Sequence, residues 1–100
     1  MTEKKFWVFF NKSLMKNRVS QGSDYADSDY KIAENIVVGI GELIMVPGVS
    51  LKTKEIMIMT LAHHTSKDAL RVLRKYDKNP DKGLEYYARL ALEECEWWNE

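Results

Sequence analysis

The sequence predicts an all-α protein, either a small five-helix bundle or a short antiparallel stack of helices. Apolar residues recur at three- and four-residue spacing along most of the chain, which places them on one face of a helix. Apolar side chains make up 45% of the 100 residues, enough for one packed core at this length. Two prolines and five glycines are few for a small β-rich domain. We therefore expect one helical domain spanning residues 1–100.

The first helix is expected over residues 3–17, where four apolar side chains share one helical face: Phe6, Phe9, Phe10 and Leu14. The aromatic run at residues 6–10 could instead form a short strand, because aromatic residues favour sheets. We prefer a helix because no partner strand is apparent elsewhere. Residues 18–29 are rich in turn and cap formers and poor in apolar residues, which predicts a flexible loop.

Two apolar helices are expected next. The second covers residues 29–45 and ends at Pro47-Gly48. Gly39 and Gly41 lower its helix propensity, which makes sense if a neighbouring helix crosses closely there. The third covers residues 51–64, with Ser50 or Thr53 as its cap, and has almost no polar side. This composition is typical of a central helix that is covered on several faces.

The last two helices are amphipathic. One is expected over residues 66–76, with Thr65 and Asp68 forming a capping box. The other is expected to begin at Asn79-Pro80, because asparagine caps helices and proline suits the first helical position. It runs to Trp98, and seven residues form its predicted buried stripe: Leu84, Tyr87, Ala88, Ala91, Leu92, Cys95 and Trp98.

Small and apolar residues are arranged around a turn in residues 61–92. They are Leu61-Ala62, Ala69-Leu70, Leu73, then the turn Asn79-Pro80-Asp81, then Leu84, Ala88 and Ala91-Leu92. This stretch, about a third of the chain, resembles a HEAT-type repeat. It departs from that pattern at Glu85, where such repeats often carry a basic residue. The resemblance implies a stack of antiparallel helix pairs and a protein-interaction role without chemistry.

Positive and negative charges cancel over the whole chain, with 15 basic and 15 acidic residues. This balance argues against disorder and against a dedicated nucleic-acid binder. The charges alternate in blocks, however: residues 1–20 and 51–83 each carry a net +4, and residues 21–50 and 84–100 each carry a net −4. Such blocks suit segments that pack side by side or a partner with a complementary face. Solvated helix surfaces are the simpler interpretation.

No residue pattern indicates an enzyme, a metal site or a cofactor. His63 and His64 are adjacent and point about 100° apart on a helix, so they do not readily share one metal ion. Cys95 lies on a predicted buried stripe, among glutamates that disfavour a thiolate. A lone cysteine, with no secretory signal and no run long enough to span a membrane, predicts a cytoplasmic protein.

Two surfaces are candidates for partner binding. The first joins exposed aromatic residues of the last helix to its acids: Tyr86, Glu93, Glu96 and Trp97. Trp7 also lies off its helix's inward face. The second is the basic face of helix 67–78: Arg71, Arg74, Lys75 and Lys78.

We hypothesise a non-enzymatic module that binds another protein or a second copy of itself. The alternative is a small regulator that binds nucleic acid through helix 67–78. The neutral total charge and the lack of aromatic residues among these basic side chains weaken the alternative.

Overall fold

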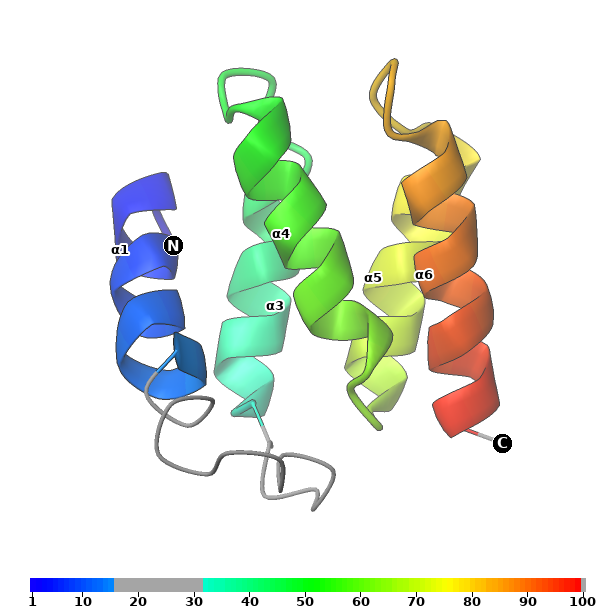
Figure 1. The fold of residues 1–100 in the computed structure, drawn as a ribbon, viewed down its shortest axis with the longest axis horizontal. Helices are drawn as coiled ribbons and strands as arrows, with labels where there is room; N and C mark the ends of the chain where they lie inside the picture. The colour runs from blue at the N-terminus through cyan, green and yellow to red at the C-terminus, as the bar shows by residue number, and fades with distance from the viewer. Residues whose placement is uncertain (16–31, 100) are drawn as a thin grey trace.

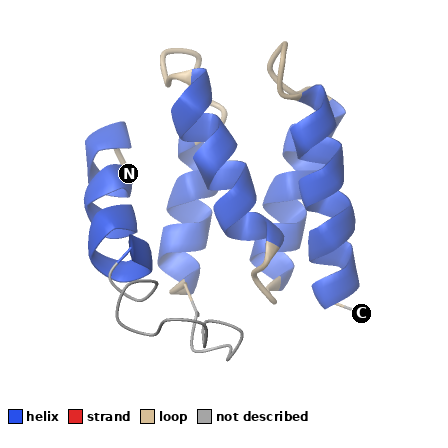
Figure 2. Ribbon diagram, viewed as in Figure 1, coloured by secondary structure: helices blue, strands red, loops and turns tan. Residues whose placement is uncertain are grey.

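Helices account for most of the residues that the structure, a computed structural model, describes, namely 1–15 and 32–99. These residues contain helices and turns and no strand (Figure 2), so the predicted all-α class is confirmed. The elements are α1 (Glu3–Phe9) with its π-helical continuation η1 (Phe10–Met15), α3 (Glu34–Leu43), α4 (Leu51–Ala62), α5 (Lys67–Lys78) and α6 (Glu85–Trp98). The predicted loop at 18–29 lies outside the described residues.

The helices stand in a row, with α1 at one end and α6 at the other (Figure 1). In that view α4 and α6 lie in front of α3 and α5. Within the row α3 packs beside α5, α4 beside α6, and α5 against α6. The HEAT-like resemblance remains a prediction, since helix packing of this kind is common to many all-α folds.

Close packing of α3 against α5 explains a glycine in the middle of α3. A Cβ atom on Gly41 would lie 2.6 Å from Cγ2 of Val72, which is closer than real Cβ contacts come. A Cβ atom on Gly39 would lie 3.2 Å from Cβ of Met1. The predicted close helix crossing is therefore found at Gly41, whereas Gly39 faces Met1, which precedes α1.

The core draws apolar side chains from every helix with described side chains. Its largest fully buried members are Phe6 of α1, Ile40 of α3, Met57 and Ile58 of α4, and Leu73 and Tyr76 of α5. The helix α6 adds Ala88, Ala91, Leu92 and Cys95.

A hydrogen-bond network joins α1 to the start of α4. The Glu3 carboxylate accepts hydrogen bonds from Ser50 (3.1 Å) and from the Thr53 hydroxyl, and Trp7 Nε1 donates to Thr53 Oγ1 at 3.1 Å. The Thr53 and Ser50 hydrogen bonds lower the pKa of Glu3, although partial burial opposes them. Ser50 also caps α4 by accepting from the Thr53 backbone N–H, so the predicted Ser50 cap is confirmed.

A buried lysine anchors the turn between α5 and α6. Lys54 of α4 is only 2% exposed, and its Nζ lies 2.9 Å from Oδ2 of Asp81. The Tyr76 hydroxyl donates to the same oxygen at 2.6 Å and accepts from the Asp81 backbone N–H. These bonds tie the turn between α5 and α6 to α4.

Two predicted helix starts are wrong. Asn79 and Pro80 do not begin α6: Asn79 follows the end of α5, and α6 begins at Glu85. Gly83 makes the intervening turn with a φ of 98°, a conformation that favours glycine. Ser66, not Thr65, caps α5, because the Ser66 hydroxyl accepts from the backbone N–H groups of Asp68 and Ala69.

Candidate interaction surface

The basic residues of α5 form one continuous face. Buried Ala69, Leu73 and Tyr76 define the inner side of the helix. Five exposed basic side chains recur at three- and four-residue steps on the opposite side, and we call them the basic face: Lys67, Arg71, Arg74, Lys75 and Lys78. The structure therefore brings together all four of the predicted residues Arg71, Arg74, Lys75 and Lys78.

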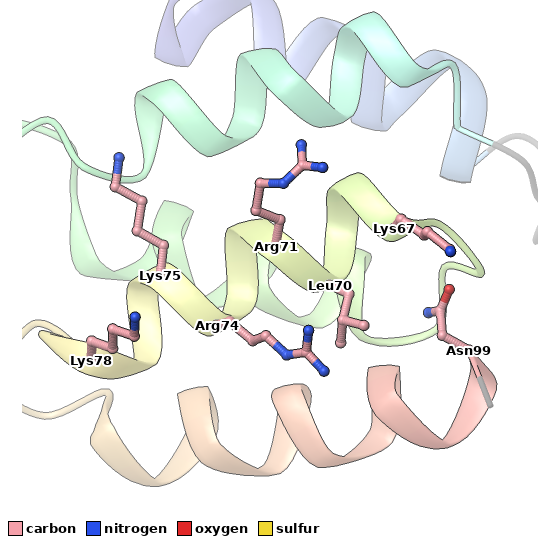
Figure 3. A pocket seen from close by; sticks show the side chains of 7 residues that line it. All are labelled: Lys67, Leu70, Arg71, Arg74, Lys75, Lys78 and Asn99. Carbon is pink, nitrogen blue, oxygen red and sulfur yellow. The ribbon is translucent and has the colours of Figure 1, made fainter.

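The basic face surrounds a shallow, open hollow in which Leu70 and Asn99 also take part (Figure 3). Arg71 and Lys75 point toward α3, whereas Arg74 points toward α6. Arg71 pairs with Asp68 at 2.7 Å, and Arg74 lies 3.6 Å from Glu96 of α6. No ion pair within residues 1–15 and 32–99 involves the three lysines of this face.

The outer side of α6 exposes large apolar side chains. Tyr86 is 71% exposed and Trp97 is 63% exposed. Tyr87, Leu90 and Trp98 are each between 43% and 45% exposed. Single apolar residues scattered over a surface are ordinary and need no explanation. These side chains all belong to one helix, so their exposure does need one.

A hollow between α4 and α6 extends this apolar region. Met59 of α4, 52% exposed, lines it together with Tyr87 and Leu90 of α6. His63, which follows the end of α4, and Glu94 of α6 also line the hollow, where Nδ1 of His63 contacts the Glu94 carboxylate. We call the following set the aromatic surface: Met59, Tyr86, Tyr87, Leu90, Trp97 and Trp98.

Helical spacing predicts the wrong exposure for three members of the aromatic surface and for one tryptophan outside it. It places Tyr87 and Trp98 on the buried stripe, but they lie at its edge and are almost half exposed. The apolar composition of residues 51–64 predicts that a neighbouring helix buries Met59, but no described helix covers that side of α4. Trp7 is not a free surface aromatic: it is partly buried, donates to Thr53 and packs edge-on against Phe6 and Phe10. Helical spacing alone does not show which neighbours cover a helix's edges.

Some charged residues of α6 pair with α5 and others face solvent. Arg89, the single basic residue of α6, forms a salt bridge with Asp77 of α5 at 2.9 Å. Glu96 faces Arg74, so this predicted partner-binding residue belongs to the contact between α5 and α6. Glu93 is exposed, and no ion pair among the described residues involves it. Glu93 is therefore the predicted acid that is left to face solvent beside Trp97.

His64 and Cys95 are both buried in the core. His64 is buried, with Nε2 3.9 Å from a Glu34 carboxylate oxygen. Its backbone carbonyl accepts a long hydrogen bond (3.6 Å) from the thiol of Cys95, which is fully buried. Burial raises the pKa of the Cys95 thiol, so the reactive thiolate is disfavoured. Within the described ranges, no group of three or more potential metal ligands converges.

Comparison of the chain with family models, curated proteins and solved structures gave no significant match. None of the helices in residues 1–15 and 32–99 is both long and apolar enough to cross a membrane.

Proposed function

We propose that this protein is a non-enzymatic interaction module that binds another protein through the aromatic surface. The observation that carries the proposal is the exposure of four aromatic rings, with Leu90 and Met59, on one side of α4 and α6. Tyrosine and tryptophan dominate binding hot spots because each removes a large apolar area from water at little entropic cost. A lone, buried cysteine fits a module that works in the reducing cytoplasm.

The ring geometry supports a preformed contact surface. Trp97 and Trp98 pack edge to face, with ring centroids 4.9 Å apart at one end of α6. Tyr86 and Tyr87 form a similar pair at the other end, with centroids 6.3 Å apart. An aromatic pair at each end of one helix offers a partner two anchor points.

Site-specific photo-cross-linking tests this proposal. A photoreactive amino acid is placed at Trp97, and in a control protein at Val38, an apolar side chain of α3 that is also exposed. After irradiation in lysate of the native cell, we expect a discrete protein adduct at position 97 and not at position 38. Trp97→Ala should weaken binding of the adduct's protein by more than about 1 kcal/mol. Identical adducts at both positions, or none at position 97, would contradict the proposal.

The basic face favours a second candidate function, nucleic-acid binding through α5. Five basic residues on one face match the charge that phosphate contacts require. This function predicts binding that falls steeply with salt and depends on Arg71 and Arg74. We rank it second because Asp68 and Glu96 already pair with these two arginines. Absent or salt-insensitive binding would exclude it.

A further inference from the structure

The outer side of α6 combines aromatic rings with one exposed carboxylate. Tyr86, Leu90, Glu93 and Trp97 are spaced by four, three and four residues, which aligns them along one side of the helix. All four are exposed. Glu93 therefore stands within the row of apolar side chains, one helical turn from Leu90 and one from Trp97.

The arginine nearest to this row already has an acidic partner. Arg89 lies one helical turn before Glu93 and is exposed, but its guanidinium is 2.9 Å from Asp77 of α5. Arg74 of α5 likewise lies 3.6 Å from Glu96. Glu93 has no ion-pair partner among the described residues, and residues 84–100 carry a net −4, so a partner's cation is the charge that suits this position.

We propose that the aromatic surface binds a basic amphipathic helix of a partner protein, whose arginine or lysine pairs with Glu93. The partner's apolar side chains would cover Leu90 and the hollow beside Met59. A cation placed at Glu93 would also reach the faces of neighbouring rings, which attract positive charge. This inference rests on the proposed function, because it names the partner's chemistry at the same surface.

Charge also argues against a second copy of this chain, and against a membrane, as the occupant of the aromatic surface. Glu93 and Glu94 lie near the middle of α6, so two copies packed through this helix would bring four carboxylates together. Helices that lie on membranes carry lysine and arginine beside their apolar face. In contrast, α6 carries four glutamates and a single arginine.

Binding of synthetic helices tests the inference with a defined probe. The basic probe is a tryptophan-free peptide of about 18 residues, long enough to span α6, with leucine and phenylalanine on one face and lysine and arginine on the other. The acidic probe replaces the basic residues with glutamate, and a scrambled probe keeps the basic composition without the apolar face. Emission of the exposed Trp97 and Trp98 reports binding.

We expect the basic probe to bind at least about tenfold more tightly than the other two. Glu93→Lys should weaken the basic probe by about tenfold and strengthen the acidic one. Glu42→Lys is the matched control, because it makes the same charge change at an exposed position on α3 and should leave both affinities unchanged. Trp97→Ala should weaken the basic probe while circular dichroism stays helical.

Equal binding of the basic and acidic probes, or no effect of Glu93→Lys, would overturn the inference. Failure of every probe to change the emission would overturn it as well. Concentration-dependent dimers, or binding to lipid vesicles, that disappear in Trp97→Ala would assign the surface to another occupant and also overturn it. A cross-link at position 97 without a preference for the basic probe would leave the proposed function standing, so the two failures are distinguishable.

Discussion

The helices α5 and α6 pack side by side and each buries one apolar stripe, yet their outer sides have opposite character. The outer side of α5 is the basic face, which is the ordinary solvated side of an amphipathic helix. The outer side of α6 exposes aromatic rings that water solvates poorly. Folding explains the buried stripe of each helix, and the need for a solvated surface explains the outer side of α5. The outer side of α6 requires another explanation, and binding supplies one.

The largest expected effect is a difference in stability between substitutions on the buried and on the exposed side of α6. Leu92 is buried and Leu90, two residues earlier, is 43% exposed. Leu92→Ala should lower the free energy of unfolding by about 2–5 kcal/mol, because it removes buried methylenes and leaves a cavity. Leu90→Ala should lower it by about 1 kcal/mol or less. Denaturant unfolding of both variants measures the difference, and equal losses would show that the outer side also stabilises the fold.

The next largest effect concerns the turn that positions α6. Asp81→Ala removes the partner of the buried Lys54 ammonium and should cost about 2–3 kcal/mol, because an uncompensated charge stays in the core. Lys54→Met removes the charge itself and fills similar space, so it should cost less. Chemical denaturation of the two variants shows which of them loses more unfolding free energy. A larger loss for Lys54→Met would mean that the salt bridge stabilises the turn more than the burial of lysine destabilises it.

Acid should weaken the same network. Hydrogen bonds from Tyr76 and Lys54 hold the pKa of Asp81 below its ordinary 3.8. A carboxyl group with a lowered folded-state pKa contributes stability above its unfolded pKa, and this stability is lost as the pH falls through the folded value. The unfolding free energy should therefore decline below about pH 4, and less steeply in Asp81→Asn. Glu3, whose pKa is also lowered, should cause the part of the decline in unfolding free energy that remains in Asp81→Asn. Identical pH profiles would exclude the assigned role of Asp81.

The smallest effect is expected on the basic face. Lys75 lies four residues after Arg71 and three before Lys78, so like charges neighbour it on both sides. Lys75→Ala should change the unfolding free energy by about 0.5 kcal/mol or less, because it relieves this repulsion but removes a positive charge from the last turn of α5, where the helix dipole favours it. Thermal unfolding at low salt would detect the change, and high salt should remove it. A larger loss of stability in Lys75→Ala would show that the methylene chain of Lys75 packs against a neighbouring part of the protein.

Local spacing is sufficient to predict the fold class and the centre of the buried stripe of α6. Periodicity alone assigns Leu92 and Cys95 to that stripe, and both are buried. The basic face also followed from spacing, since it depends only on positions within one helix. Tyr86 and Trp97 were expected to be exposed for the same reason, and they are.

Contacts between distant segments account for what the sequence did not predict. The turn before α6 contains Asp81, which binds Lys54, 27 residues away along the chain. Trp7 is partly covered because Thr53 supplies a hydrogen-bond partner 46 residues away. Met59 is exposed because no described helix packs on that side of α4. Each outcome depends on helix placement, which periodicity within one segment does not determine.

The central claim is that the aromatic rings on the outer side of α6 serve binding and not folding. The most direct test is the free energy of unfolding of the double variant Tyr86→Ala/Trp97→Ala, measured against the wild-type protein. Because both side chains are mostly exposed, we expect a loss of about 1 kcal/mol or less, with the helical content unchanged. A loss as large as that of Leu92→Ala would contradict the claim, because it would make these rings part of the structure that stabilises the fold.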